Sequence, residues 1–465
     1  MSSDWELTRL RDHIRVKHGF AFKGEHFADE PTEYQLTTPG NFAIGGGFQD
    51  GKAKYYNGPI PAEFVLNPGD LLVTMTDLSK AADTLGYSAV VPKKNGITWL
   101  HNQRVGRVQL LPGKSTSLTF LHYLLRSPDY RHHVLAGATG STVKHTSPDR
   151  ILDFQFLLPP PSEAHRIGNL LDALDDRITL LRETNATLEA IAQALFKSWF
   201  VDFDPVRAKR DGRAPKGMDE ATAALFPNSF EDSELGEVPR GWSPRPFSET
   251  VHVIGGGTPK TTVPEYWNGN IPWFSVVDAP AASDVFVIDT EKHISEAGLL
   301  GSSTKLLPAG TTILSARGTV GRLALTSLEM AMNQSCYGLK GVAGDKYFTF
   351  LSTARLVDQL KRRAHGSVFD TITRDTLAGV NLVFPADRDV IRVFEAAIEP
   401  LMLRILENLQ QSRSLASLRD TLLPRLISGQ LRLPEAKSEA AALQATRAQS
   451  GQEPTFNFAP HDSGQ

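Results

Sequence analysis

The fold is decided by the stretch SEAHRIGNLLDALDDRITLLRETNATLEAIAQALFKSWFVDF, residues 162–203, where apolar side chains recur at alternating spacings of four and three. Residues 387–428 repeat this pattern at a constant offset of 227 residues, without a gap. A heptad pattern of this length predicts coiled-coil helices. The predicted seam contains Leu174, Ile178, Leu181, Asn185, Leu188, Ala192 and Leu195, matched by Leu401, Ile405, Asn408, Ser412, Leu415, Arg419 and Leu422.

The segments before the two helices are also related to each other. Residues 5–23 align with 242–260, so that Gly19 matches Gly256 and Lys23 matches Lys260. Further on, the Asn-Gln pair at 102–103 matches the pair at 333–334, and Gly140-Ser141 matches Gly366-Ser367. Both copies mix β-rich runs (70–76, 105–111, 311–315, 380–384) with helical runs (118–126, 348–363). We therefore expect an α+β protein in which two similar mixed α/β domains are joined by two long helices with pseudo-two-fold symmetry.

The expected organisation has six parts. They are a first domain at 1–161, a first helix at 162–203, a connector at 204–240 rich in Pro, Gly and charge, a second domain at 241–386, a second helix at 387–428, and a disordered tail at 429–465. A helix of about 40 residues is roughly 60 Å long. Because the second domain starts soon after the first helix ends, antiparallel packing of the helices needs no long return path. Polar seam residues such as Asn185 and Ser412 are typical of positions that set register.

Composition narrows the class of protein without deciding its function. The chain of 465 residues is 41% apolar and 22% charged, with a net charge of −3. This charge neither indicates a polybasic arm nor argues against a DNA partner, because local patches decide that question. A single cysteine, Cys336, excludes a disulfide framework, and neither a signal sequence nor an apolar run of membrane length occurs. We expect a cytoplasmic protein.

Several catalytic motifs are incomplete. The Gly-Lys-Ser at 113–115 lacks the earlier glycine of a phosphate-binding loop, and the Leu-Pro-Pro-Pro at 158–161 lacks the acid or amide and the aromatic residue of an adenine methyltransferase. The Asp-Gly-Lys at 50–52 has no preceding Pro-Asp and is typical of a turn rather than a nuclease metal site. The triple glycines at 45–47 and 255–257 lack dinucleotide-binding spacing and favour a turn or an approach to the DNA backbone. No zinc pattern is present, so we expect no metal and no cofactor.

Three motifs carry a family resemblance. The sequence LEAIAQALFKSWFVDFDP at 188–205 resembles the central conserved region of type I restriction-modification specificity subunits, and LRDTLLPRLISGQL at 418–431 resembles their distal conserved region. The sequence GGGTPK at 255–260, followed by Tyr266-Trp267 and the Ile-Pro-Trp at 271–273, is similar to the opening of many of their target recognition domains. The chain departs from the family at the start of each helix, where Glu163-Ala164 and Asp389-Val390 stand in place of a Glu-Gln pair.

The resemblance implies a non-catalytic DNA-binding subunit that serves in defence against foreign DNA. Each domain would bind one half of a split target on double-stranded DNA, and the helices would set the spacer. Two modification (methyltransferase) subunits would pack on the chain, and restriction (translocase and nuclease) subunits would join them. Two alternatives remain: a coiled-coil adaptor whose domains bind protein, and an enzyme fused to recognition domains, which the missing motifs and the length disfavour.

Candidate DNA-contacting residues follow from the duplication. Lys23 and Lys260, at matched places after glycine-rich turns, suit phosphate contacts. Gln103 and Gln334 can pair with adenine, but their recurrence beside Asn102 and Asn333 favours a structural or backbone role. Base readers should lie where the copies differ. These positions are Lys52, Lys54, Tyr55, Thr76, Lys80 and Arg104 in the first domain, and Thr258, Thr261, Arg317, Thr319, Ser335 and His365 in the second.

Overall fold

The computed structural model describes residues 5–280, 284–363 and 371–433. These residues fold as two compact units: those up to 177 together with those from 415 onward form the first, and those between 178 and 414 form the second. The predicted tail lies outside the described residues from position 434 onward. Among the described residues, no helix has both the length and the apolar character needed to cross a membrane.

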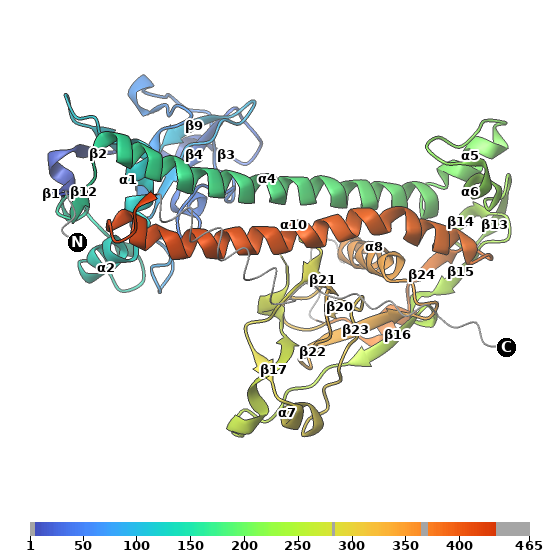
Figure 1. The fold of residues 1–465 in the computed structure, drawn as a ribbon. Helices are drawn as coiled ribbons and strands as arrows, with labels where there is room; N and C mark the ends of the chain where they lie inside the picture. The colour runs from blue at the N-terminus through green and yellow to red at the C-terminus, as the bar shows by residue number, and fades with distance from the viewer. Residues whose placement is uncertain (1–4, 281–283, 364–370, 434–465) are drawn as a thin grey trace. The chain divides into compact units, whose positions relative to one another are not determined.

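The two predicted long helices are present as α4 (Pro161–Phe200) and α10 (Asp389–Ile427), as Figure 1 shows. In the first unit, Asp175 of α4 is paired with Arg419 of α10, and Glu163 near the start of α4 is paired with Arg432 just after α10. In the second unit, Asn185 contacts Asn408, and Phe200 lies against Phe394. Residue numbers rise along α4 as they fall along α10, so the helices are antiparallel within each unit. The predicted seam residues are all buried or half-buried.

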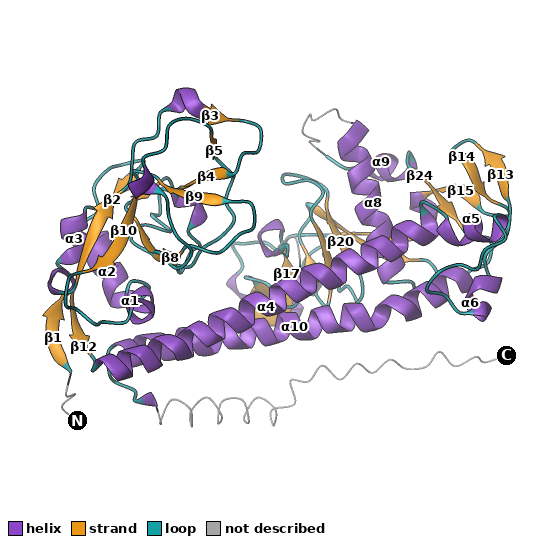
Figure 2. Ribbon diagram, turned by 90° about the horizontal axis from the view of Figure 1, so that it is seen from above, coloured by secondary structure: helices purple, strands orange, loops and turns teal. Residues whose placement is uncertain are grey.

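The first unit contains two small sheets and a set of short helices (Figure 2). Its central sheet has the order β2-β10-β6-β8, formed by Ile14–His18, Val105–Leu110, Leu71–Thr74 and Ser88–Val90, and all of its pairings are antiparallel. The second sheet has the order β3-β5-β4-β9, formed by Phe27–Ala28, Tyr55–Tyr56, Tyr34–Thr37 and Thr98–His101. Smaller ladders join β1 (Glu6–Arg9) to β12 (Gln155–Leu158) and β7 (Thr76–Asp77) to β11 (Lys144–His145). The helices are α1 (Leu118–Leu124), α2 (Pro128–Ala136) and α3 (Pro148–Leu152).

The core of the first unit joins the domain to both long helices. Val73 and Val108 of the central sheet, Leu121 of α1, Leu171 of α4 and Leu426 of α10 belong to one buried apolar cluster. Burial of large aliphatic side chains contributes about 1.5–3 kcal/mol each. The long helices are therefore part of the folded domain rather than an appendage to it.

The second unit repeats this plan. Its central sheet has the order β16-β23-β20-β21-β18, formed by Val251–Gly255, Cys336–Gly341, Thr312–Ser315, Leu323–Thr326 and Phe286–Val287. Beside it lies the sheet β19-β17-β22, formed by His293–Ile294, Trp267–Phe274 and Ala331–Met332. β15 (Ser243–Pro246) pairs with β24 (Asn381–Phe384), as β1 pairs with β12 in the first unit. The remaining helices of this domain are α7 (Glu296–Leu300), α8 (Tyr347–Arg363) and α9 (Arg374–Ala378).

The shared strand order confirms the duplication expected from the sequence. The four predicted β-rich runs contain β6, β10, β20 and β24; the helical run 118–126 contains α1, and the run 348–363 covers α8 except its first residue. The parallel pairing of β4 with β9 is matched by that of β17 with β22. The two domains therefore share one topology even where their sequences have diverged.

The segment predicted as a connector outside any core, 204–240, is folded. It forms α5 (Asp204–Arg210), α6 (Glu220–Ala224) and the hairpin of β13 (Phe230–Ser233) with β14 (Gly236–Pro239). Val206 and Phe226 are buried in the same apolar cluster as Phe200 and Trp242. The expectation is corrected because a few apolar side chains, spaced among charged and turn residues, are enough to anchor the segment to the end of α4.

Candidate nucleic-acid interface

Each domain gathers three loops at one edge of its central sheet. In the first unit His18 of β2 and Thr74 of β6 pair with the first residues of β10, so both strands end where β10 begins. In the second unit Gly255 of β16 and Ser315 of β20 likewise pair with the first residues of β23. We call this the recognition edge: the loops after β2 and β6 with the turn before β10, and the loops after β16 and β20 with the turn before β23.

The turn before β10 and its counterpart before β23 have the same internal structure. The side-chain oxygen of Asn102 accepts a hydrogen bond from the backbone N–H of Arg104 at 3.0 Å, and that of Asn333 accepts from Ser335 at 3.0 Å. Such Asx turns use the side chain to mimic a backbone turn. The recurring asparagines therefore have a structural role, whereas Gln103 and Gln334 are exposed.

Matched glycines let the neighbouring loop approach this turn. A Cβ on Gly19 would lie 2.2 Å from the carbonyl oxygen of Asn102, and one on Gly256 would lie 1.9 Å from that of Asn333. Both distances are far below an ordinary carbon–oxygen contact of about 3.3 Å. Only glycine fits at these two positions, because any side chain would clash with the neighbouring backbone. The close approach brings two loops of the recognition edge together.

Two indoles hold the glycine-rich loop of the second unit. Trp273 Nε1 donates to the carbonyl of Gly257 at 3.0 Å, and Trp267 Nε1 donates to the carbonyl of Lys260 at 3.2 Å. The two rings meet edge to face with centroids 5.2 Å apart. This contact gives a physical reason for the Tyr-Trp and Ile-Pro-Trp motifs that follow the glycines. It leaves the Lys260 side chain exposed at the recognition edge.

The first unit fixes its corresponding loop by apolar packing. Phe20 and Phe22 lie edge to face at 5.1 Å, Phe20 contacts Phe64, and Phe22 contacts Tyr56. Lys23 beyond them keeps 76% of its side chain exposed, with its amine 3.6 Å from a Glu25 carboxylate oxygen. Both predicted phosphate-contacting lysines are therefore exposed after a loop that is held in place, although different side chains hold it.

Positions where the two copies differ occupy one common backbone frame. The N–H of Met75 donates to the carbonyl of Arg104 at 3.1 Å, just as that of Ala316 donates to Ser335 at 2.8 Å. The next residue on each loop pairs with backbone from elsewhere in its domain: Thr76 pairs with His145 of β11, and Arg317 forms an isolated β-bridge with Thr371. Thr76 and Arg104 of the first unit thus correspond in space to Arg317 and Ser335 of the second. The frame is shared while the side chains that it presents are different.

Thr76 and His145 form a pair that sequence reasoning found only in part. Thr76 is buried, and its hydroxyl lies 3.2 Å from Nδ1 of His145, whose ring is exposed. His145 and the neighbouring Lys144 of β11 therefore present polar groups at the recognition edge. The available signal was their position just after Gly140-Ser141, a pair that recurs at 366–367.

The remaining predicted residues are more scattered. Lys80 is exposed on the loop after β7, which Asp77 holds by accepting from the N–H groups of Ser79 and Thr84. Burial alone would raise the pKa of Asp77, but these hydrogen bonds lower it below its usual value. Thr258, Thr261 and Thr319 are exposed on loops of the second unit, and the Thr258 hydroxyl donates to Gln334.

Three predicted residues belong to the other sheet of the first unit. Lys52 precedes β5, Tyr55 is part of it, and the Lys54 amine lies 3.9 Å above the ring of Phe27. The second sheet, rather than the recognition edge, thus carries these side chains. His365 lies outside the described residues.

Metal ligands and the thiol of the single cysteine are the remaining candidate groups. Within 5–280, 284–363 and 371–433, no three His, Cys, Asp or Glu side chains gather as a metal site would require. Cys336, at the start of β23, is buried, and this burial raises its pKa to about 12. The thiol is therefore protonated and unreactive at neutral pH.

Comparison with known proteins places the chain in a family. The family model described as type I restriction modification DNA specificity domain matches residues 2–190 and 239–409. The HindI specificity subunit of Haemophilus influenzae is 28% identical over 358 residues, covering 67% of this chain and 77% of that protein. The MjaIX specificity subunit of Methanocaldococcus jannaschii is 26% identical over 179 residues, covering 37% of this chain and 41% of that protein.

A solved structure supports the same assignment at the level of fold. The S subunit of a type I restriction-modification system from M. genitalium superposes with a TM-score of 0.55 and 15% identity, covering 92% of this chain and 97% of that one. The two matched segments each contain one domain and the greater part of the long helix that follows it. As its helical motifs predicted, the chain belongs to the type I restriction modification DNA specificity family and is a specificity subunit with two such domains.

Proposed function

We propose that each domain reads one half of a split DNA target through its recognition edge, while α4 and α10 set the unread spacer. The observation that carries this proposal is the duplicated frame, in which the same backbone holds exposed Arg104 beside buried Thr76 in one domain, and exposed Arg317 beside half-buried Ser335 in the other. Two copies with one frame and different side chains suit two different half-sites.

In this proposal, phosphate contacts come from places where the two copies match, and base contacts come from places where they differ. Lys23 and Lys260 lie at equivalent positions and are exposed, which supports a role in sequence-independent phosphate binding. Arg317, exposed on the loop after β20, has the planar donor group that pairs with guanine in a major groove. The other predicted base readers remain proposals of the same kind.

The subunit acts as a scaffold and carries out no chemistry itself. Its relatives are named as specificity subunits of type I restriction enzymes, which supports double-stranded DNA, modification subunits and restriction subunits as partners. The duplication of domain and helix supports two modification subunits, one for each copy. A DNA-reading subunit works in the compartment that holds the DNA, which is the cytoplasm in a bacterial or archaeal cell.

A domain exchange tests the proposal. Residues 241–385 are replaced by the matching domain of a related subunit, the hybrid is assembled with its modification subunit, and methylated bases are mapped across a genome. One half-site should change while the other half-site and the spacer length are kept. Changes in both half-sites would show that the domains do not read independently. Absence of any sequence-dependent methylation or DNA shift would favour the adaptor alternative.

Single substitutions separate the two kinds of contact. Lys260→Ala should weaken binding to many sequences equally and reduce the slope of log affinity against log salt by about one unit. Arg317→Ala should cost roughly 1–3 kcal/mol on one base pair of one half-site. Lys216→Ala, at an exposed position between α5 and α6, is the matched control and should change neither quantity. Equal effects of Lys260→Ala and Lys216→Ala would remove the phosphate role from Lys260.

A further inference from the structure

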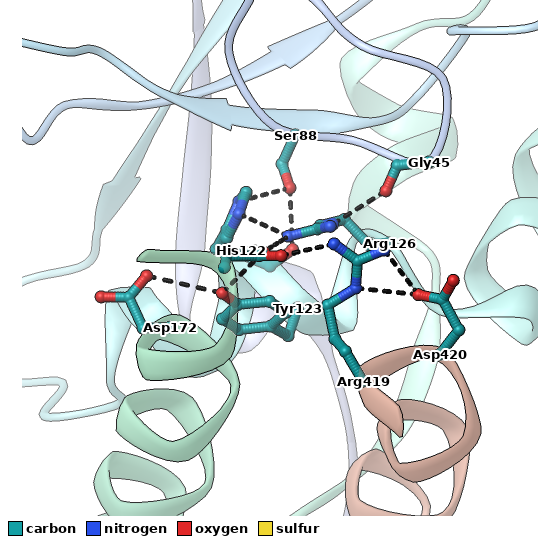
Figure 3. A network of polar contacts seen from close by, with 9 residues as sticks. Gly45, Ser88, His122, Tyr123, Arg126, Asp172, Arg419 and Asp420 are labelled. Carbon is teal, nitrogen blue, oxygen red and sulfur yellow. Dashed lines mark hydrogen bonds and ion pairs between the residues drawn. The ribbon is translucent and has the colours of Figure 1, made fainter. Parts of the chain in front are cut away.

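A buried array of charges ties the first recognition domain to both long helices (Figure 3). Asp175 of α4 accepts a hydrogen bond from Arg126 Nη1, just after α1, at 2.6 Å, and another from Arg419 of α10. Only 5% of the Arg126 side chain is exposed, with 24% for Asp175 and 18% for Arg419. One carboxylate thus joins a domain, the helix that follows it and the antiparallel partner of that helix.

The array continues into the domain. Arg126 Nε donates to the carbonyl of Gly45 at 2.8 Å, and a Cβ on Gly46 would lie 2.5 Å from the Arg126 side chain. Gly45, Gly46 and Gly47 all have positive φ. The triple glycine therefore forms a turn that wraps over Arg126. Arg126 therefore connects Asp175 to the loop that contains Gly45–Gly47.

Histidine and tyrosine complete the network on α1. Burial lowers the pKa of His122 to about 3, so its ring is neutral. Its Nε2 lies 3.1 Å from Arg126 Nη1, which can only donate, and its Nδ1 lies 2.9 Å from the Ser88 hydroxyl. The proton is therefore on Nδ1. Tyr123 also donates to Asp175, at 3.0 Å.

The charge on Asp175 is stabilised within this network. Burial alone would raise the pKa of Asp175, but the guanidinium groups of Arg126 and Arg419 lower it below its usual value. The carboxylate stays ionised at neutral pH, and its contacts are charge-assisted. Such contacts are stronger and more directional than neutral ones.

The second unit shows that the fold does not require these charges. By the 227-residue offset, Met402 stands at the place of Asp175, and Ala192 stands at the place of Arg419. Both are fully buried. Buried ion pairs are weak sources of stability, and apolar replacements of similar volume are often neutral or stabilising. Apolar residues stand at the two equivalent places, so the second unit packs its helix pair there without these charges.

We propose that Asp175, held between Arg126 and Arg419, fixes the orientation of the first recognition domain on the helix pair and thereby the number of unread base pairs. This inference rests on the proposed function. One base pair changes the separation of two half-sites by about 3.4 Å and their relative rotation by about 35°. Apolar packing permits small rotations, whereas a shared carboxylate with two guanidinium partners permits few. These three are positioning residues and touch no base.

The test uses Arg419→Met in the complete complex with its modification subunit. This variant removes the link to α10 while leaving Asp175 paired with Arg126. Methylation rates are measured on duplexes that carry both half-sites with the natural spacer n or with n − 1 and n + 1. The preference for n should fall about tenfold, the effect of losing a charge-assisted hydrogen bond. Discrimination against a mismatch in either half-site should stay unchanged.

Controls keep the result interpretable. Arg404→Met removes an exposed arginine of α10, whose partner Glu407 is also exposed, and should leave the spacer preference unchanged. If Arg419→Met does not fold, as judged by its melting curve, Arg419→Gln keeps a donor to Asp175 and should show the same change to a smaller degree.

Two outcomes would overturn the inference, and a third concerns the proposed function. A folded Arg419 variant that keeps the full preference for n shows that the array does not set the spacing. Loss of discrimination within a half-site shows that the array supports base reading through the Gly45 turn instead. A wild-type complex that methylates all three spacers equally contradicts the proposed function itself.

Discussion

Gly256→Ala should break the recognition edge of the second domain while leaving the first domain intact. The added Cβ would lie 1.9 Å from the carbonyl oxygen of Asn333, whereas an unstrained carbon–oxygen contact is about 3.3 Å. The glycine-rich loop would therefore have to move by roughly 1.4 Å away from the turn before β23. This movement stretches the hydrogen bond from the Gly257 N–H to the carbonyl of Met332, now 3.0 Å.

The magnitude follows from these contacts. Loss of one backbone hydrogen bond costs about 1 kcal/mol. Forced displacement of a packed segment adds roughly 1–3 kcal/mol. The total of about 2–4 kcal/mol should lower the melting temperature of the second unit by roughly 5–15 °C. Gly255→Ala is the matched control, because a Cβ at that neighbouring position meets no atom within 4 Å.

The assay combines calorimetry with methylation of DNA that varies in one half-site at a time. Gly256→Ala should lose discrimination in the second half-site and keep it in the first, and Gly255→Ala should behave as wild type. Gly19→Ala, whose Cβ would lie 2.2 Å from the Asn102 carbonyl oxygen, should show the mirror-image result. Equal melting temperatures and equal half-site discrimination for the two alanine variants at 255 and 256 would refute the steric argument.

Three further predictions concern buried polar groups of the second unit. Burial raises the pKa of Glu395 to about 7. The native state therefore keeps a proton on Glu395 that the unfolded state releases above about pH 4.5. The stability that this proton contributes is lost as pH rises from about 4.5 to 7. Glu395→Gln should remove up to about 3 kcal/mol of that pH dependence in urea unfolding at pH 5 and 7.5; identical profiles would contradict the assignment. Asn408→Leu should lower the free energy of unfolding by about 1–3 kcal/mol, because Asn185 Oδ1 loses the donor that lies 2.9 Å away. The double variant with Leu at both 185 and 408 should be at least as stable as wild type. Additive losses in a double-mutant cycle would count against this prediction. Trp273→Phe should cost about 1 kcal/mol by removing the donor to Gly257 and should weaken binding to the second half-site alone; unchanged binding would show that the indole does not fix the loop.

The long helices and the duplication could be predicted from sequence because both leave periodic signals. A seam from Leu174 to Leu195 has to face apolar surface over many turns, so its spacing is constrained at every step. The antiparallel direction followed from connectivity. What periodicity did not supply was the pairing across the seam. Asn185 matches Ser412 as a copy, but its side chain contacts Asn408, because a repeat offset relates equivalent residues and not residues in contact.

The candidate site was less accessible to sequence reasoning because its geometry depends on side chains from distant strands. The indole of Trp273 donates a hydrogen bond to the carbonyl of Gly257, and no motif around either residue predicts this contact. The folded connector was missed for a related reason. Phe226 is one apolar residue in a polar segment, and its burial depends on Trp199 and Trp242, with ring centroids 5.2 and 6.1 Å away. Composition averages over a segment, whereas anchoring depends on single residues.

The two domains are attached to the long helices by different means. In the second unit Glu395 of α10 accepts from the N–H groups of Lys346 and Phe348 and so caps the start of α8, while Phe348 and Phe394 pack in the apolar core. In the first unit the corresponding attachment includes the charged array around Asp175. A duplicated protein that kept the strand frame in both copies but changed their attachments has separated two tasks. Under the proposed function, the frame would determine how a half-site is contacted, and the attachment would determine where that contact is made.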